Sequence, residues 1–372
     1  MVHIAFAGGG TGGHIYPGLA VASYLQKQGD YRIFWIGSHT GMDKAIVSEA
    51  GFEFFGIPSG KLRRYVSLQN LADVFKVGAG FFAARNILKR EKPALLFSKG
   101  GFVSVPPCAA AAALGIPVYT HESDFSPGLA TKLNSRFAHT IFTAYQDTAA
   151  FFPPSCQARI ILSGNPVRAE FRAADPALGR AFLKVGADER LLLVLGGSQG
   201  AREINELVWK SLPELTKHYV VVHQTGPAQA LDTQPTERYR PYPYIRGELP
   251  HVIAAAELVL GRSGAGTVWE CATLGRPMVL IPLHGSGTRG DQVENARFFE
   301  KAGAAKVLLG EAPETGIGPD ALIQQVASLA GDLETRSAMA AAAWRIGAVD
   351  GAKTIAETLM KHPHKGTGSH AL

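Results

Sequence analysis

The sequence predicts an α/β protein made of two doubly wound domains, each a parallel sheet with helices on both faces. Three observations lead to this prediction. Short apolar runs alternate with helix-like segments along most of the 372 residues. A glycine-rich turn follows an apolar run at three places: Gly8–His14, Gly196–Gly200 and Gly261–Thr267. A chain of this length is also longer than one hydrophobic core usually holds, so two domains are expected.

The first half of the chain predicts seven strands, and helices lie between them. The strands are expected at Val2–Ala7, Tyr31–Ile36, Phe52–Ile57, Ala94–Ser98, Pro117–Thr120, Thr140–Thr143 and Arg159–Leu162. The helices are expected at Tyr16–Gln28, Met42–Ala50, Leu68–Arg90, Val103–Leu114 and Pro127–Ser135. Ligands of parallel sheets lie at the carboxyl ends of the strands. The polar residues there are therefore candidates for a site: His14, Ser98–Gly101 and His121–Asp124.

A turn at Gly164–Arg168, followed by a polar stretch to Pro176, marks the expected domain boundary. Beyond it the pattern starts again. Strands are expected at Leu191–Leu195, Tyr219–Gln224, Leu258–Leu260, Met278–Ile281 and Ala305–Leu308, and a polar loop at Asp232–Pro243. Helices are expected at Ala201–Thr216, Thr267–Leu274, Gln292–Ala302, Glu334–Ile346 and Ala352–Lys361. The predicted domains are residues 1–165 and 166–345, and residues 346–372 form a last helix with a frayed tail from His362.

Composition excludes several classes of protein. Hydrophobic residues make up 46% of the chain and charged residues 18%, as in ordinary soluble α/β proteins. Cys108, Cys156 and Cys271 are too far apart in sequence for a disulfide framework or a metal-binding motif, which fits a reducing cytoplasm. We expect no leader peptide. Prolines and Gly115 interrupt the most apolar window, Phe102–Tyr119, so it predicts a core helix and a strand instead of a membrane span.

The net charge of +6 comes entirely from residues 1–165. Within them, Lys61–Lys92 has eight basic residues against Asp73 and Glu91. The apolar residues Leu71, Phe75, Val77, Phe81 and Phe82 are interleaved with these charges. Two interpretations remain open: a helix that contacts a negatively charged membrane surface, or an ordinary amphipathic helix with its apolar face in the core.

The first glycine turn contains G-x-G-x-x-G at Gly8, Gly10 and Gly13. A nicotinamide site also needs an acidic residue at the end of the second strand, to bind the ribose hydroxyls. The sequence there is Ile36–His39, which has no carboxylate. No glycine turn is followed by the lysine of a P-loop either. A dehydrogenase and a P-loop nucleotidase are therefore disfavoured.

His14 stands where the first helix begins. The positive end of a helix disfavours the imidazolium form, so the ring should be neutral near pH 7 and able to accept a proton. A neutral imidazole that faces a ligand is the expected general base for activating a hydroxyl group. The alternative is that His14 caps the turn and fixes its shape, and position alone does not decide between the two.

The second half offers groups suited to a nucleotide sugar, and each has a plainer interpretation. Ser198 and Gln199 lie in a loop rich in backbone donors, which suits a diphosphate, although a tight turn alone would need the same residues. Glu270 is placed to accept two hydrogen bonds from a ribose diol, or else lies in solvent. Asp291 and Gln292 suit the hydroxyls of a sugar. Arg168 and Arg262 suit a phosphate, or else are surface residues.

Taken together, these segments resemble the bacterial MurG family of glycosyltransferases over nearly the whole chain. The matching segments are Gly8–Gly18, Lys99–Ser104, His121–Glu122, Gly164–Arg168, Gly196–Ala201, Arg262–Ala265 and Asn295–Ala304. The resemblance implies the GT-B fold, with a cleft between two Rossmann-like domains and a last helix that returns to the first. It implies inverting transfer of N-acetylglucosamine from UDP-N-acetylglucosamine to the C4 hydroxyl of the muramyl sugar of lipid I, which gives lipid II. It implies no metal and no cofactor, and the chain has no DxD-like pair.

The resemblance also implies roles for residues. The C-terminal domain would bind the donor, with Glu270 at the ribose, the Ile245 backbone at the uracil, and Asp291 and Gln292 at the sugar. The other expected donor contacts are Thr11, Gly12, Gly13, Asp124, Arg168, Ser198, Gln199, Arg262 and Ala265. The N-terminal domain would take the acceptor, with His14 as the base. The expected acceptor and membrane side consists of Leu71, Phe75, Phe81, Lys99, His121 and Glu122.

The same resemblance implies partners and a location. The partners are UDP-N-acetylglucosamine, undecaprenyl-linked lipid I, anionic lipids of the inner leaflet and other cell-wall synthesis proteins, and nucleic acid is not among them. The expected location is peripheral, on the cytoplasmic face of the cell membrane.

Two segments differ from the family pattern. The chain has His121-Glu122-Ser123-Asp124 where the best-known members have His-Glu-Gln-Asn, and Asp291-Gln292 where many have Gln-Gln or His-Gln. These differences leave three rivals open. They are a same-fold transferase that acts on another lipid such as diacylglycerol, a non-catalytic nucleotide-sugar binding protein, and a UDP-sugar epimerase.

Overall fold

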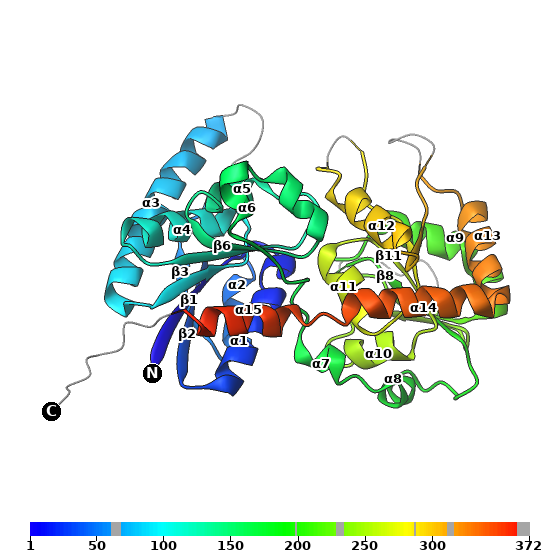
Figure 1. The fold of residues 1–372 in the computed structure, drawn as a ribbon. Helices are drawn as coiled ribbons and strands as arrows, with labels where there is room; N and C mark the ends of the chain where they lie inside the picture. Colours follow the sequence, from blue (N-terminus) through cyan, green and yellow to red (C-terminus); the bar gives the residue numbers. More distant parts are fainter. Residues whose placement is uncertain (61–67, 198, 228–233, 286–287, 311–315, 363–372) are drawn as a thin grey trace. The chain divides into compact units, whose positions relative to one another are not determined.

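The computed structural model describes residues 1–60, 68–197, 199–227, 234–285, 288–310 and 316–362, without the side chains of residues 68–74. The chain forms two compact units (Figure 1). Unit 1 consists of Met1–Arg168 with Asp350–Leu372, and unit 2 of Ala169–Val349. The first boundary lies between Arg168 and Ala169, whereas it was expected after residue 165. The second lies between Val349 and Asp350, whereas it was expected after residue 345.

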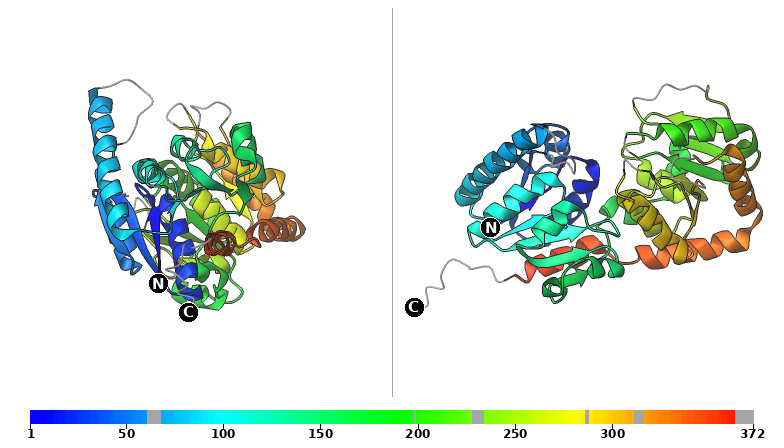
Figure 2. Two further views of the ribbon diagram at one scale, coloured as in Figure 1. Left: turned by 60° about the vertical axis from the view of Figure 1, so that its left-hand side comes forward. Right: turned by 90° about the horizontal axis from the view of Figure 1, so that it is seen from above.

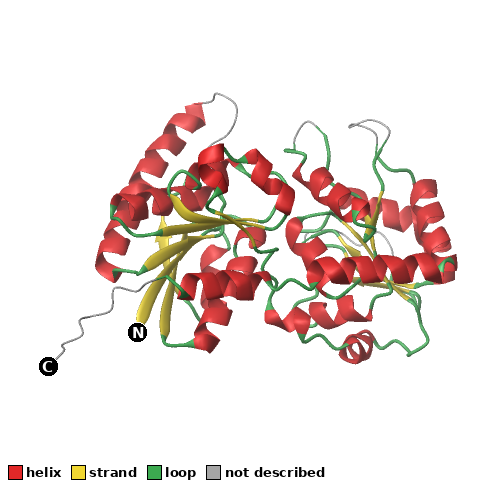
Figure 3. Cartoon of the chain, viewed as in Figure 1, coloured by secondary structure: helices red, strands yellow, loops and turns green. Residues whose placement is uncertain are grey.

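Unit 1 is built on a seven-stranded parallel sheet with the order β3-β2-β1-β4-β5-β6-β7. Figure 3 shows the sheet in yellow and the helices around it in red. Each predicted strand is present, within two residues at either end. The strands are β1 Val2–Ala7, β2 Tyr31–Ser38, β3 Glu53–Ile57, β4 Leu95–Ser98, β5 Val118–Glu122, β6 Ala138–Thr143 and β7 Ile160–Leu162. The α-helices are α1 Tyr16–Gln28, α2 Asp43–Glu49, α3 Leu68–Glu91, α4 Val105–Ala113, α5 Leu129–Asn134, α6 Pro154–Gln157 and α15 Gly351–Met360. Short 3₁₀ turns η1 Gly12–His14, η2 Phe102–Ser104 and η3 Gln146–Phe151 complete the unit.

The central strand β1 shows why the sheet needs helices on both faces. Successive side chains of a strand point to opposite faces. Ile4 and Phe6 belong to a buried cluster with residues of α1 and α15, whereas Ala5 and Ala7 belong to one with residues of α3 and α4. All four side chains are at most 1% exposed. The continuous apolar run is therefore explained by burial on both sides.

Helix α15 belongs to unit 1 although it follows unit 2 in sequence. Ala352, Ile355, Ala356 and Leu359 are buried in the same cluster as Ile4, beside α1 (Figures 1 and 2). Beyond α15, His362 lies beside Tyr119, with 3.0 Å between its Nδ1 and the tyrosine hydroxyl. The expected frayed tail, residues 363–372, lies outside the described residues.

Unit 2 has a six-stranded parallel sheet with the order β10-β9-β8-β11-β12-β13. Its strands are β8 Leu191–Leu195, β9 Val220–Gln224, β10 Tyr239–Tyr242, β11 Leu258–Gly261, β12 Met278–Leu280 and β13 Ala305–Val307. Its helices are α7 Ala169–Arg172, α8 Pro176–Leu183, α9 Arg202–His218, α10 Leu249–Ala255, α11 Ala265–Thr273, α12 Asp291–Lys301, α13 Pro319–Gly331 and α14 Leu333–Gly347.

The predicted loop at Asp232–Pro243 is wrong in its last part, because β10 lies there. Pro241 in the middle of this strand cannot donate a hydrogen bond to a neighbour. The strand tolerates it because β10 is at the edge of the sheet and pairs only with β9. Helix α10 was not predicted at all.

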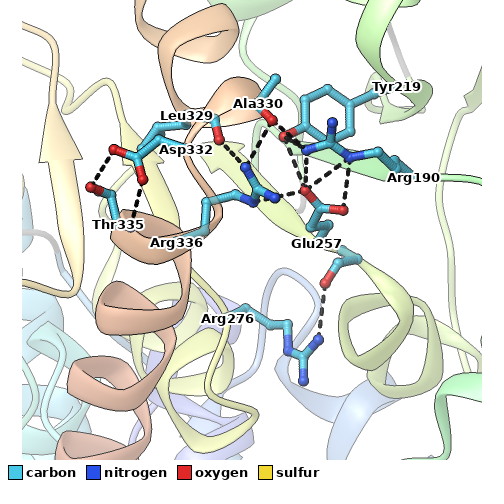
Figure 4. A network of polar contacts seen from close by, with 10 residues as sticks. Arg190, Tyr219, Glu257, Arg276, Leu329, Ala330, Asp332, Thr335 and Arg336 are labelled. Carbon is cyan, nitrogen blue, oxygen red and sulfur yellow. Dashed lines mark hydrogen bonds and ion pairs between the residues drawn. The ribbon is translucent and has the colours of Figure 1, made fainter.

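A charged cluster fixes the amino ends of the strands in unit 2 (Figure 4). The Glu257 carboxylate, which precedes β11, contacts the guanidinium groups of Arg190 at 3.0 Å and Arg336 at 2.9 Å. Both arginines also donate to the carbonyl of Ala330, at 3.0 and 2.9 Å. Burial would raise the pKa of Glu257, but the hydrogen bond and charge of Arg190 and the charge of Arg336 lower it overall. The cluster ties the junction of α13 and α14 to the sheet.

Candidate functional site

Each sheet has one point at which the strand order reverses, and ligands of such sheets bind outside the carboxyl ends of the strands there. In unit 1 this point lies between β1 and β4, and in unit 2 between β8 and β11. The loops that leave these four strands are Gly8–His14, Lys99–Gly101, Gly196–Gly200 and Arg262–Gly264. The described site residues that lie in these four loops are Thr11, Gly12, Gly13, His14, Lys99, Gln199 and Arg262.

The first glycine turn is built around a buried carboxylate that the sequence did not reveal. Asp43, the first residue of α2, is 0% exposed. Its carboxylate accepts hydrogen bonds from the backbone N–H of Gly10 at 2.9 Å and of Ser38 at 3.0 Å. A Cβ atom on Gly9 would lie 1.9 Å from this carboxylate, so only glycine fits there. One donor of the turn is thus already used, and a negative charge lies beneath it.

The turn after β4 packs against the first glycine turn. A Cβ on Gly101 would lie 2.7 Å from the carbonyl oxygen of Gly9 and 3.0 Å from the His14 ring. His14 ends the turn η1, its N–H donates to the carbonyl of Thr11 at 3.1 Å, and α1 follows directly. The imidazole is half-buried, whereas Thr11 and Gly13 are exposed. The ring is therefore held at the rim of the turn, where it can serve either as a base or as a cap.

Beside His14 lies a cluster of charged and polar residues, all buried except the half-buried Asp124, which we call the Lys99 cluster: Lys99, Glu122, Ser123, Asp124 and Asn165. Lys99 follows β4 and is 2% exposed. Its ammonium donates to the Ser123 hydroxyl at 2.7 Å, and that hydroxyl donates to Asn165 Oδ1 at 2.6 Å. Burial lowers the pKa of Lys99 to about 8, although the charges of Glu122 and Asp124 oppose the shift.

Glu122 ends β5 and holds the turn that follows it. Its carboxylate accepts hydrogen bonds from the backbone N–H of Ser123 at 2.9 Å, Asp124 at 3.1 Å and Gly128 at 3.0 Å. Burial, together with the charge of Asp124, raises the pKa of Glu122. The carboxylate thus fixes the backbone from Ser123 to Gly128.

His121 is a supporting residue in this structure. It is 0% exposed, and its Nε2 donates to the carbonyl of Gly164 at 3.0 Å. Burial and the charge of Lys99 lower the pKa of His121 well below its ordinary value, so the ring is neutral. Lys99, His121 and Glu122, from which acceptor contacts were expected, all lie at the expected edge of the sheet and are buried there.

In unit 2, the loop after β8 is held by neutral groups. Gly200 has φ +79°, and a Cβ there would lie 2.1 Å from the carbonyl oxygen of Thr225, at the end of β9. Gln224, which is 3% exposed, accepts from the Ile245 N–H at 3.0 Å and donates to the carbonyl of Gly197 at 3.4 Å. Gln224 is a second residue that the sequence did not reveal. Because the backbone N–H of Ile245 already donates to Gln224, its carbonyl is the backbone group that remains for a nucleobase.

The loop after β11 is tied to two helices. Arg262 forms an ion pair with Glu203 of α9 at 2.6 Å and donates to the carbonyl of Ile281 at 3.0 Å. Its charge is therefore largely matched within the protein. Ser263 donates from its hydroxyl to the carbonyl of Gln292 at 2.7 Å. This bond brings the loop to the start of α12, where Asp291 pairs with Arg289 at 3.0 Å.

The remaining predicted donor residues are distributed between the units. Ala265 is the first residue of α11, and Glu270 is half-buried on the same helix. The amide oxygen of Gln292 accepts from the Leu283 N–H at 3.0 Å. Gln199 is exposed, and Ser198 lies outside the described residues. Arg168 belongs to unit 1, where its guanidinium lies 4.9 Å from the centre of the Tyr16 ring.

Helix α3 carries both a core face and an exposed face. Phe81, which was expected on the membrane side, is half-buried and packs against the cluster that contains Ala84 and Leu88. Phe75 and Phe82 are 72% and 65% exposed, and they are seven residues apart, on one side of the helix. The side chain of Leu71 lies outside the described residues. No helix in the described part of the chain is both long and apolar enough to span a bilayer.

Comparison with known proteins gives the family. The model of the glycosyltransferase family 28 N-terminal domain matches residues 4–143, and that of its C-terminal domain matches residues 191–359. The chain therefore belongs to glycosyltransferase family 28, and its two parallel-sheet α/β domains are those of the GT-B fold. No group of three or more His, Cys, Asp and Glu side chains gathers as a metal site among the described residues.

Named relatives show to which group within this family the chain belongs. A Treponema denticola protein named UDP-N-acetylglucosamine–N-acetylmuramyl-(pentapeptide) pyrophosphoryl-undecaprenol N-acetylglucosamine transferase is 50% identical over 88% of each chain. A protein of the same name from Shouchella clausii is 42% identical over 88% of this chain and 91% of the relative. The crystal structure of Acinetobacter baumannii MurG has a TM-score of 0.73 and 27% identity, and covers 97% of this chain and 100% of that one. Within family 28, the chain belongs to the MurG transferases.

Proposed function

We infer that this protein transfers N-acetylglucosamine from UDP-N-acetylglucosamine to the C4 hydroxyl of the muramyl sugar of lipid I, which forms lipid II. The observation that carries this inference is the 50% identity, over 88% of both chains, with the Treponema denticola protein named as the N-acetylglucosamine transferase. The two reversal points, one in each unit, agree with an enzyme that handles two ligands. Neither an epimerase nor a transferase for another lipid is favoured by these relatives.

The donor is assigned to unit 2. Its glycine loop precedes the 17-residue helix α9, whose amino end is suited to a diphosphate. Gln199 and Ser198 belong to this loop, and Glu270 on α11 suits the ribose. The carbonyl of Ile245 suits the uracil, and Asp291 and Gln292 suit the sugar. Asp43 beneath the first glycine turn supports the same assignment, because a buried carboxylate disfavours a second negative charge there.

The acceptor is assigned to unit 1, with His14 as the base. In the reaction, the C4 oxygen of lipid I forms a bond to the anomeric carbon of the donor sugar. The bond from that carbon to the diphosphate breaks, UDP leaves with the electron pair, and inversion results. His14 takes the hydroxyl proton in this proposal, because its half-buried imidazole stands just before α1, where the positive end of a helix disfavours the imidazolium form. The proposal involves no metal ion and no cofactor.

Membrane contact is assigned to α3. Phe75 and Phe82 are exposed on it, and Lys76 and Lys89 are exposed on the same helix. An apolar strip with flanking lysines fits the surface of an anionic leaflet. A peripheral enzyme on the cytoplasmic face, near other cell-wall synthesis proteins, is the location that follows from this proposal.

The test is a transfer assay with the purified protein, labelled UDP-N-acetylglucosamine and lipid I in detergent. We expect labelled lipid II, and no product from UDP-galactose or diacylglycerol. Incubation without an acceptor should leave the nucleotide sugar unchanged, whereas an epimerase would convert it. Tight UDP binding without turnover on any acceptor would overturn the inference. His14→Ala with near-normal turnover would remove His14 from the role of base.

A further inference from the structure

Lys99 is a buried cation whose charge the mechanism above does not use. Its side chain is 2% exposed, and among the described residues its ammonium makes one hydrogen bond, to Ser123. An ammonium group has three donors and is costly to bury unless opposite charge is near. Cys108 on the helix that follows is, by contrast, an inert buried thiol, because burial raises its pKa to about 12.

The opposite charge near Lys99 comes from the turn after β5. Glu122 is 5% exposed, and Asp124 is half-buried two residues further on. Both carboxylates favour the charged form of Lys99. They also disfavour each other, because the charge of Asp124 raises the pKa of Glu122. Two adjacent carboxylates of low exposure are therefore tolerated because a cation lies behind them.

Lys99 also connects three segments of unit 1. Through the Ser123 hydroxyl it reaches Asn165, so the loop after β4, the turn after β5 and the segment after β7 are joined in one chain of hydrogen bonds. Gly100 and Gly101, next to Lys99, pack against the His14 ring. A movement of Lys99 would thus be felt both at the turn Ser123–Gly128 and at His14.

We propose that Lys99 is a positioning residue of the transfer reaction: its charge holds Ser123 and the carboxylates of Glu122 and Asp124 in the arrangement that receives the acceptor sugar. This proposal rests on the proposed function, and assigns Lys99 and Asp124 as a matched pair. It predicts that removing the charge of Lys99 or of Asp124 alone lowers transfer activity more than removing both.

The test is a double-mutant cycle with wild type, Lys99→Met, Asp124→Asn and the double variant, each assayed for kcat and KM with lipid I. Misplacement of a reacting group by about 1 Å costs about 100-fold in rate, so we expect a loss of that size in kcat/KM for Lys99→Met. The double variant should recover most of it. The Kd of UDP for Lys99→Met, measured by calorimetry, should not change. Lys132→Met on α5, an exposed lysine of the same unit, is the matched control and should resemble wild type.

A pH profile separates positioning from mere structural support. Burial lowers the pKa of Lys99 to about 8, so its charge is present below pH 8 and is lost as the pH rises through that value. The charged groups that act on Lys99 are Glu122 and Asp124, and it acts in turn on His121. The activity of wild type should therefore fall above pH 8, and the double variant should lack this fall.

The outcomes distinguish the two proposals. Wild type without turnover on lipid I overturns the proposed function. Active wild type, with Lys99→Met within about threefold of it or with losses that simply add in the double variant, overturns the role of Lys99 alone. If Lys99→Met does not fold, Ser123→Ala keeps the charge of Lys99 but removes its hydrogen bond to the Ser123 hydroxyl and, with it, the link to Asn165. That variant should lose kcat and keep the fall above pH 8, and a kcat equal to that of wild type would contradict the proposal.

Discussion

The two units have the same kind of sheet and a glycine turn at the same topological position, yet they place their charged clusters at opposite ends of the strands. In unit 1, Asp43, Lys99 and Glu122 lie at the carboxyl ends of the strands, beside the candidate site. In unit 2, Arg190, Glu257 and Arg336 lie at the amino ends, away from it (Figure 4). A glycine turn alone therefore does not define an anion site, because the group beneath the turn decides which charge it accepts.

The carboxylate beneath the first turn gives the largest expected effect. Asp43→Ala leaves the N–H groups of Gly10 and Ser38 without their acceptor, and each such buried group costs about 1–3 kcal/mol. We expect the free energy of unfolding to fall by about 3 kcal/mol in urea titrations, with a large loss of transfer activity. Asp147→Ala on η3, an exposed aspartate of unit 1, is the control. Stronger UDP binding at the first turn of the Asp43 variant would strengthen the comparison, because it would show that the carboxylate alone excludes the nucleotide. A free energy of unfolding equal to that of wild type would contradict the role of Asp43.

The second turn should depend on shape instead of charge. In Gly200→Ala, the added Cβ would meet the carbonyl oxygen of Thr225 at 2.1 Å, at a φ of +79°. Strain of about 2 kcal/mol corresponds to about a 30-fold weaker Kd for UDP. Gly197→Ala is the matched control: its φ is +85°, but the position has no described atom within 4 Å. It should lose only about fivefold, because only the backbone penalty of about 1 kcal/mol remains. Equal losses in both variants would contradict the role of the contact with Thr225.

The charged cluster of unit 2 should affect stability without affecting binding. Glu257→Gln leaves Arg190 and Arg336 without their shared carboxylate, which we expect to cost about 2 kcal/mol after allowance for its partial exposure. The lowered pKa of Glu257 contributes stability above the ordinary carboxyl pKa, and this contribution is lost as the pH falls through the lowered value. Denaturation curves of the variant should therefore show a weaker dependence on acid pH. A changed Kd for UDP at neutral pH would show that the two ends of the sheet are coupled.

The smallest effect is expected on α3, where two neighbouring phenylalanines should separate membrane contact from folding. Phe82→Ser removes an exposed ring, and we expect about a tenfold weaker partition into anionic vesicles with an unchanged melting temperature. Phe81→Ser removes a half-buried ring that packs against the core and should lower stability by about 2 kcal/mol. Vesicle sedimentation measures the membrane binding of each variant, and thermal denaturation measures its stability. If Phe82→Ser binds vesicles as wild type does, α3 is not the membrane contact.

Local patterns predicted most of the fold. The apolar runs fixed the strands β1 and β8 to the residue, and α1 likewise, because burial on both faces leaves an uninterrupted signal. The prediction failed at β10, where Pro241 indicated a loop. That strand depends on its position at the edge of the sheet, which a local pattern does not contain. Helix α3 was predicted, but not which of Phe81 and Phe82 faces the core.

The candidate site was predicted as a set of loops but not as a set of contacts. His14, the loop after β8 and the loop after β11 followed from glycine spacing and strand ends. Asp43 and Gln224 were missed because each acts through hydrogen bonds to backbone groups far away in sequence. An acidic residue in the first turn of α2, soon after β2, was the available signal for Asp43. The burial of Lys99, His121 and Glu122 needed the three-dimensional structure.

The position of α15 has a consequence for synthesis of the protein. Ile355 and Leu359 occupy the same apolar cluster as Ile4, which is made some 350 residues earlier. While the ribosome is still translating, residues 1–168 have no partner for that surface, whereas Ala169–Val349 is already complete. Unit 2 can therefore complete its fold first on the nascent polypeptide. Unit 1 must wait for α15, and until then the apolar surface that α15 covers is open to chaperones.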